Sequence, residues 1–214
     1  MTGCIAGSQY IPSIEYFAHW MQNGHMTIER HEHFQKRSWR NKTAILGPDN
    51  PMQLTVPLQK GKHQQKMIDE VLISYDEPWP KIHFSGMKAA YGKTAFFNEI
   101  GSGLEEILFS ETKSLWILNK NLFQFFIDLL PGTWAMTETG EYLHTYPPDV
   151  IDLRAGIPAG HSSIANKEYP IYPQVQRLHK EHLPNLSILD VLCHLGPDTY
   201  TYLVKYASKL YEKP

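Results

Sequence analysis

The side chains best suited to bind an anion lie in one short basic run. Four cationic residues fall within seven positions that include no acid, with two aromatic residues among or beside them: Lys36, Arg37, Arg40 and Lys42, with Phe34 and Trp39. The planar guanidinium group matches phosphate and carboxylate, and aromatic rings exclude water beside it. The run therefore predicts a phosphate or carboxylate site, and the alternative interpretation is a solvated basic loop.

A histidine further along the chain is the best candidate for acid–base chemistry. His83 lies at helical spacing from Met87 and Tyr91, on the apolar side of a predicted helix. An imidazole needs little tuning to exchange a proton near neutral pH, so His83 beside Tyr91 is suited to act as an acid or a base. The alternative is a core histidine whose hydrogen bonds are satisfied within the protein.

Two other pairs have a plainer interpretation. His31 and His33 lie two residues apart with no third ligand at a recognised spacing, so we expect no bound metal. Cys193 and His194 are neighbours in a predicted helix, where adjacent side chains point about 100° apart. A packed thiol is therefore a better interpretation of Cys193 than a nucleophile with its base.

The first half of the chain reads as strands that would position the basic run. The predicted strands cover residues 4–12, 25–29, 40–46, 52–58 and 70–75, with a helix capped by Ser13 after the first of them. We therefore expect one α+β domain over residues 1–214. Its N-terminal half would be an antiparallel β-meander, packed with helices from the middle and C-terminal parts.

Helices are predicted in the second half, separated by one long irregular region. The helical segments are residues 79–91, 104–109, 114–130, 187–195 and 198–212. Ser187 and Asp190 fit a capping box at the start of the fourth of these helices. The irregular region, Gly132 to Pro184, is rich in proline and glycine, and loops of this length often close over a binding site.

Composition and charge restrict the class of protein. Of 214 residues, 20 are Lys or Arg and 22 are Asp or Glu, and the segment 30–66 carries a net charge of +6 while the rest carries −8. This overall balance argues against nucleic acid as the main partner. The apolar stretch 115–130 is short for a membrane span. With only Cys4 and Cys193 and no secretory pattern at the start, we expect a cytoplasmic protein.

Several stretches, taken in order, resemble the WbqC-like protein family. They are YIPSIEYF, IERHEHFQKRSWRNK, LTVPL, WPKIHFSGMKAAYGKTAFF, DLR, YPQV and NLSILDVLCHLGP. Trp39 and Lys42 depart from the family pattern, where Tyr and Arg are expected, and relatives usually have Phe-Asn at Cys193-His194. The resemblance implies a connection with O-antigen or other surface-polysaccharide gene sets, without supplying a reaction.

We therefore expect a transferase-type enzyme that acts on a phosphorylated sugar or a sugar nucleotide, without a cofactor. The predicted catalytic residues are His83, Glu32 and Tyr91, and the predicted substrate-binding residues are Glu29, His31, Lys36, Arg40, Asn41 and Arg154. Glu29 or Glu32 would orient the imidazole or a substrate hydroxyl. The alternative is a protein that binds or assembles a glycan intermediate without chemistry, and a homodimer is left open.

Overall fold

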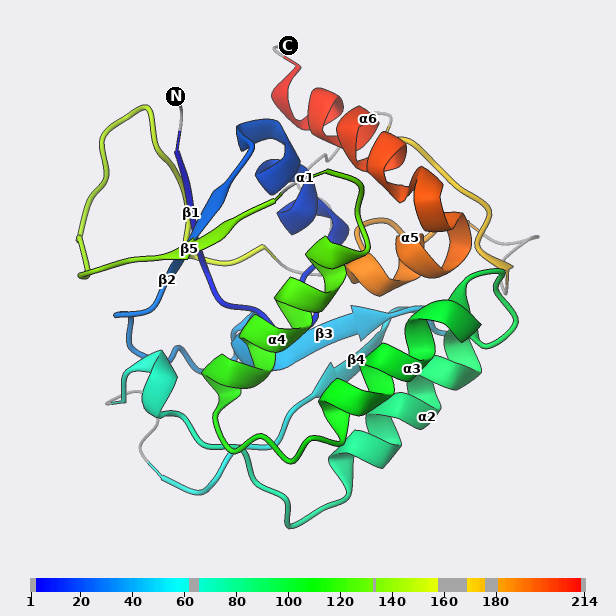
Figure 1. Ribbon diagram of the computed structural model, residues 1–214, viewed down its shortest axis with the longest axis horizontal. Coiled ribbons are helices and arrows are strands. Elements are labelled where there is room, and N and C mark those ends of the chain that lie inside the picture. Colours follow the sequence, from blue (N-terminus) through cyan, green and yellow to red (C-terminus); the bar gives the residue numbers. More distant parts are fainter. Residues whose placement is uncertain (1–2, 62–65, 133, 158–168, 176–180, 213–214) are drawn as a thin grey trace.

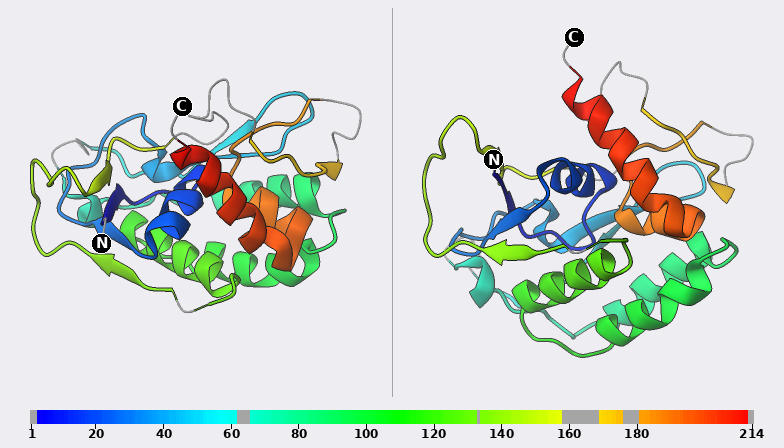
Figure 2. Two further views of the ribbon diagram at one scale, coloured as in Figure 1. Left: turned by 90° about the horizontal axis from the view of Figure 1, so that it is seen from above. Right: turned by 45° about the horizontal axis from the view of Figure 1, so that its top comes forward.

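The protein has an α+β fold around a parallel sheet. The computed structural model describes residues 3–61, 66–132, 134–157, 169–175 and 181–212. Within them, one four-stranded sheet has the order β5-β2-β1-β6, and every neighbouring pair in it runs parallel. Its strands are β1 (Cys4–Gly7), β2 (Met26–Glu29), β5 (Met136–Glu138) and β6 (Ile151–Leu153), shown in Figures 1 and 2.

The predicted antiparallel β-meander is therefore wrong. Between β1 and β2 the chain passes through a ten-residue helix, α1 (Ile14–Asn23), and returns to the same end of the sheet. Such a crossover makes two successive strands parallel. The other two strands each have three residues and lie in the region predicted to be irregular, since segments so short show no alternating pattern.

A separate two-stranded sheet follows the basic run. In it, β3 (Lys42–Ile45) pairs antiparallel with β4 (Met52–Thr55), as predicted for this part of the chain. Both strands are shorter than expected, and β4 ends before Pro57, which has no amide hydrogen for a ladder. The predicted strand at 70–75 forms only isolated bridges, from Leu72 to Ser114 and from Ile73 to Leu58.

The predicted helices all occur in the structure. Beyond α1 they are α2 (Trp79–Tyr91), α3 (Phe97–Leu108), α4 (Leu115–Asp128), α5 (Ile188–Leu195) and α6 (Thr199–Tyr211), with short 3-10 turns at Trp39–Asn41, Ile68–Glu70 and Gly196–Asp198. Ser13 caps α1 as predicted, because its hydroxyl accepts a hydrogen bond from the amide of Tyr16 at 3.3 Å.

The predicted capping box of α5 is wrong. Ser187 lies at the N-cap position, but its buried hydroxyl makes no cap hydrogen bond and has no partner in the part of the chain that the structure describes. Asp190 is fully buried and accepts hydrogen bonds from the Tyr172 hydroxyl and from the Gln174 side chain, the latter at 2.9 Å. Asp190 therefore holds the segment with Tyr172 and Gln174 against α5 and does not take part in a capping box.

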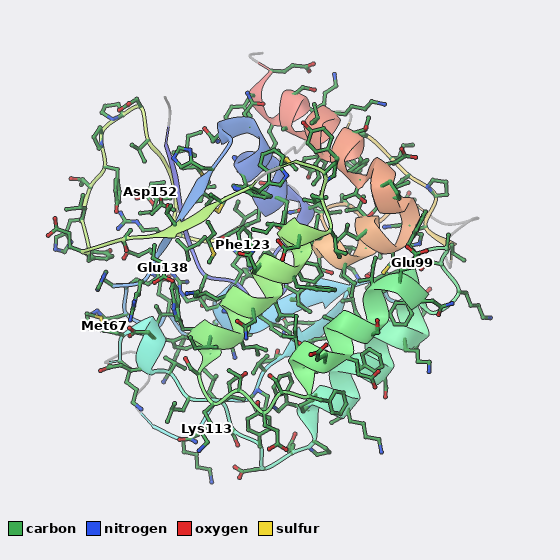
Figure 3. All side chains as sticks on the ribbon, in the orientation of Figure 1. Met67, Glu99, Lys113, Phe123, Glu138 and Asp152 are labelled. Carbon is green, nitrogen blue, oxygen red and sulfur yellow. The ribbon has the colours of Figure 1, made fainter. Side chains whose placement is uncertain are left out.

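The core lies where α1, α4 and the sheet meet. Phe123 of α4 packs against three aromatic rings of α1, those of Tyr16, Phe17 and Trp20, at centroid distances of 6.0, 5.3 and 5.7 Å. Figure 3 shows Phe123 at this central position. Among the described residues no helix has both the length and the apolar character needed to cross a membrane. The apolar stretch 115–130 is accordingly a core helix, α4.

Candidate functional site

The carboxyl ends of the parallel strands bring charged residues to one edge of the sheet. Gly7 ends β1, Glu29 ends β2, and Arg154 directly follows β6. The chain leaves β1 toward β2, whereas β6 lies on the other side of β1, so the strand order changes direction between β1 and β6. Open parallel sheets bind ligands outside the carboxyl ends at such a point. We call Glu29, Glu32, Arg40 and Arg154 the carboxyl-edge cluster.

Glu32 and Arg40 form a buried ion pair in this cluster. Their exposed fractions are 3 % and 2 %, and the Arg40 guanidinium donates two parallel hydrogen bonds to the carboxylate, from Nε to Oε1 at 2.7 Å and from Nη2 to Oε2. Nη2 also donates to the carbonyl oxygen of Arg154 at 3.1 Å. Burial raises the pKa of Glu32, and the neighbouring Arg40 opposes that rise.

A glycine at the end of β1 makes room for this ion pair. A Cβ atom at Gly7 would lie 2.9 Å from both Arg40 Nη2 and Glu32 Oε1. Two charged groups can approach the backbone of β1 so closely only because position 7 has no side chain. The donors of Arg40 are thus engaged with acceptors of the protein itself.

Glu29 lies beside Arg154 with one oxygen satisfied and one not. Oε1 accepts hydrogen bonds from the amide of His31 at 2.7 Å and from the Thr139 hydroxyl at 2.6 Å. Oε2 lies 3.7 Å from Arg154 Nη1 and has no hydrogen-bond partner among the described residues, although Glu29 is fully buried. The ring of His31 is bound through Nε2 to the carbonyl of Thr139 at 3.1 Å.

Arg154 is held by Asp152 of its own strand and by the loop that precedes this strand. Its Nε and Nη2 atoms donate to the carboxylate of Asp152, at 2.9 and 2.6 Å, and this contact lowers the pKa of Asp152. Its guanidinium carbon lies 4.9 Å and 4.8 Å from the ring centres of Tyr142 and Tyr146. Figure 3 shows Asp152 and Glu138 on the side of the molecule where these loops lie.

The basic run forms an open groove beside the two-stranded sheet. We call this the basic groove. Its volume is about 480 Å³, and its lining consists of Phe34, Lys36, Arg37, Asn41, Lys42, Thr55, Val56, Pro57, Leu58, Gln59, Lys60 and Gly61. Among the described residues none of its four cations forms an ion pair, and no acid belongs to this lining. The Asn41 amide donates to the carbonyl of Val56 at 2.8 Å and so supports the wall of the groove.

The three residues predicted to be catalytic have different neighbours. His83 is 4 % exposed, its Nδ1 lies 2.9 Å from the Tyr10 hydroxyl, and burial lowers its pKa from 6.5 to about 4. Glu32 pairs with Arg40 at the carboxyl edge. The fully buried hydroxyl of Tyr91 accepts a hydrogen bond from the amide of Leu46 at 2.9 Å.

The predicted substrate-binding residues fall into two groups. Glu29, His31, Arg40 and Arg154 meet at the carboxyl edge, while Lys36 and Asn41 line the basic groove. Sequence reasoning missed Lys60, Thr139, Tyr142, Tyr146 and Asp152 as members of these two sites. Asp152 carried a signal, since it belongs to the DLR stretch with Arg154, but the loop residues had none.

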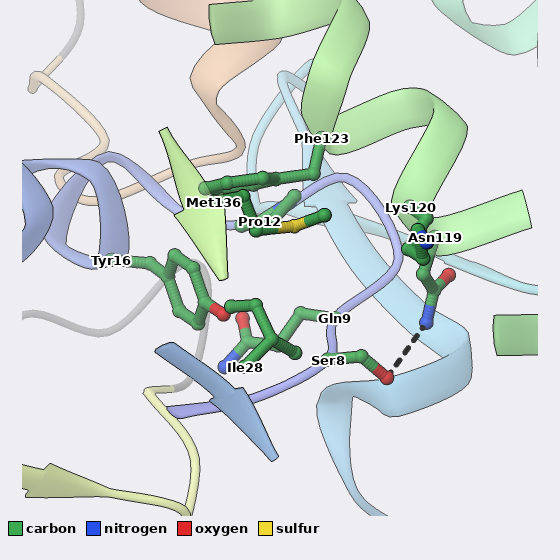
Figure 4. A pocket seen from close by; sticks show the side chains of 9 residues that line it. All are labelled: Ser8, Gln9, Pro12, Tyr16, Ile28, Asn119, Lys120, Phe123 and Met136. Atoms are coloured by element: carbon green, nitrogen blue, oxygen red, sulfur yellow. Dashed lines mark hydrogen bonds between the residues drawn. The ribbon is translucent and has the colours of Figure 1, made fainter. Parts of the chain in front are cut away.

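Two other positions offer little room for a substrate. The first three amides of α1, where phosphate binds in many parallel sheets, have protein acceptors at 2.9, 2.8 and 3.3 Å: the Leu186 carbonyl, the Asn185 side chain and the Ser13 hydroxyl. A cavity of about 10 Å³ between α4 and the segment that follows β1 is lined by polar and apolar side chains, among them Ser8, Gln9 and Asn119 (Figure 4). It has room for about one water molecule.

Two further candidates from the sequence concern metal binding and the thiol of Cys193. No group of three or more His, Cys, Asp or Glu side chains is placed to hold a metal ion in this part of the chain. Cys193 is fully buried, and burial raises the pKa of its thiol well above the ordinary value, so it is a packed thiol as predicted.

Comparison with known proteins identifies the family and nothing more specific. No curated protein and no solved structure matches the chain. The model of the WbqC-like protein family matches residues 7–145, which include the basic run, β2 to β5 and the helix that carries His83. This match covers more than half of the sequence, and the chain therefore belongs to the WbqC-like protein family.

Proposed function

We propose that this protein is a transferase-type enzyme of cell-surface polysaccharide biosynthesis that binds a phosphate-bearing sugar precursor in the basic groove. The observation that supports this proposal is the charge of the groove: Lys36, Arg37, Lys42 and Lys60 surround it without an acid among its lining residues. Unpaired cations around an open hollow attract phosphate, because they have no internal carboxylate to neutralise them.

The floor of the groove suits the rest of such a precursor. Phe34, Val56, Pro57 and Leu58 supply apolar surface between the cations. A sugar or nucleoside ring with an attached phosphate presents apolar faces and a charged end, which match this floor and this rim. Arg40 has no direct part in our proposal, since its donors are bound to Glu32, Gln35 and Arg154.

A binding protein without chemistry is the second candidate function. The observation that favours it is that, among the residues that the structure describes, no carboxylate or imidazole lines the groove. For a transferase, the acid or base would come from the carboxyl-edge cluster or from the second substrate.

Calorimetric titration with nucleoside diphosphate sugars tests the proposal. We expect wild type to bind, and the double variant K36A/K42A to bind about 1.5–3 kcal/mol more weakly, the range for hydrogen bonds to charged groups. The matched control is K88A, which removes an exposed lysine of α2 outside the groove. Equal affinity of K36A/K42A and K88A, or no binding by wild type, would contradict the phosphate site.

The same samples separate the two candidate functions. A transferase given a mixture of acceptor sugars releases nucleoside diphosphate, which chromatography detects. Binding without release under these conditions would favour the non-catalytic candidate.

A further inference from the structure

The segment that joins β5 to β6 contacts the rest of the protein mainly through the side chain of Arg154. We call residues 140–149 the β5–β6 loop, and Figure 1 shows it projecting from the edge of the sheet. All but Tyr146 are exposed. Apart from a local turn in which Val150 donates to the Pro147 carbonyl, the hydrogen bonds and ring contacts from this loop to other described residues all end on Arg154. They include hydrogen bonds to the carbonyls of Leu143 and His144, at 2.6 and 3.3 Å.

Next to Arg154, the buried carboxylate of Glu29 has one oxygen without a hydrogen-bond donor among the described residues. Glu29 Oε2 is buried without a hydrogen bond, while Oε1 of the same group has two. Arg154 Nη1, at 3.7 Å, is too distant to donate to it. Buried carboxylate oxygens normally accept a hydrogen bond, because leaving one unsatisfied costs free energy. The site is therefore incomplete as it stands, and a hydroxyl would complete it.

We propose that the carboxyl edge binds a hydroxyl-rich sugar ring, one hydroxyl of which donates to Glu29 Oε2, and that the β5–β6 loop closes over it. The position between β6 and β1 is the point where parallel sheets of this kind bind ligands. This inference deepens the proposed function and rests on it, because it gives the sugar of the donor or of the acceptor a place of its own.

The charges at the carboxyl edge favour an uncharged ligand over an anion. Three carboxylates, of Glu29, Glu32 and Asp152, accompany two guanidinium groups, of Arg40 and Arg154. An anion would meet no net positive charge there, in contrast to the basic groove. Arg154 covers one face of the rings of Tyr142 and Tyr146, but Tyr142 is 42 % exposed and so adds apolar surface on which a sugar ring can pack.

Saturation-transfer NMR with methyl glycosides of glucose, galactose and N-acetylglucosamine tests the sugar site. We expect signals with wild type and at least a fivefold loss of affinity for E29Q, which keeps the shape of the side chain but removes its charge. The matched control is E138Q. Glu138 ends the neighbouring strand β5, but its carboxylate already pairs with Arg30 and Lys120. Thermal unfolding of both variants checks that they fold.

Hydrogen–deuterium exchange tests the loop. The bound glycoside should slow amide exchange in residues 140–149, and R154K should speed it without ligand, while exchange in α2 and α3 stays the same. A nucleoside diphosphate without sugar should leave this exchange unchanged and still bind to the groove, which keeps failure of the sugar site distinct from failure of the phosphate site.

The NMR and exchange experiments can either support or overturn the sugar site. Wild-type signals that E29Q weakens and E138Q retains would support the sugar site. No signal from any glycoside, equal signals for E29Q and E138Q, or exchange in residues 140–149 that no glycoside alters would each overturn the inference.

Discussion

Replacing Arg40 by methionine should unfold the protein more easily, by an amount that depends on pH. Removing one partner of a buried ion pair costs about 3–5 kcal/mol, because the remaining charge stays buried without compensation. Arg40 and Glu32 are 2 % and 3 % exposed and share two hydrogen bonds, so this range applies to them. We expect a loss of this size in R40M at neutral pH.

The pH dependence follows from the carboxyl group that is left behind. Burial raises the pKa of Glu32 above 4.5 in wild type, and Arg40 counteracts it, so in R40M that pKa rises further. A carboxyl whose pKa is higher in the folded than in the unfolded state takes up a proton on folding. The free energy of unfolding of R40M therefore falls as pH rises from the unfolded value through the folded one. Acidification should recover part of the loss.

Urea unfolding followed by circular dichroism, from about pH 5 to about pH 8, measures this effect. The control R30M removes an exposed arginine that pairs with Asp69 and Glu138, and it should cost about 0–1 kcal/mol. The double variant E32M/R40M should recover most of the stability at neutral pH, because no charge is left unpaired. A loss in R40M as small as in R30M, or equal at both ends of the pH range, would refute the reasoning.

Two further predictions concern Ser187 and His83, whose surroundings in the structure differ from the roles predicted from the sequence. S187A should leave the free energy of unfolding unchanged or raise it slightly, because the Ser187 hydroxyl is buried without a partner; a loss of about 1 kcal/mol on urea unfolding would restore the predicted cap. The imidazole of His83 should stay neutral down to its lowered pKa of about 4, so its NMR signals should not shift between about pH 8 and about pH 5; a midpoint near 6.5 would contradict its burial. The pKa of His83 is lower in the folded state, about 4, than in the unfolded state, 6.5. His83 should therefore lower the free energy of unfolding as pH falls from 6.5 to about 4.

Local patterns predicted most elements but not their arrangement. The alternation around β4 and the spacing of Trp79, His83 and Met87 are local, and both segments formed the predicted type of element, although β4 ends before Pro57. Pairing partners are not local, because β1 pairs with a strand about 150 residues away in sequence, at Cys4 and Ile151. The strands β5 and β6 have only three residues each, too few to show an alternating pattern, so two of the four strands of the sheet had no sequence signal.

Among the site residues too, local sequence patterns predicted some positions and not others. Lys36 and Lys42 are exposed or half-buried on a contiguous run, and such a cluster predicts a basic groove directly. Arg40 belongs to the same run but points inward, because the short turn at Trp39–Asn41 directs it toward Glu32. Sequence spacing cannot tell an inward arginine from an outward one when the turn between them is irregular.

A crystal structure of the protein with a bound nucleoside diphosphate sugar tests the central claim most directly. We expect phosphate oxygens at about 3 Å from the side chains of at least two of the groove cations, Lys36, Arg37, Lys42 and Lys60. Phosphate bound instead at the carboxyl edge or at the start of α1, with the groove empty, would contradict it.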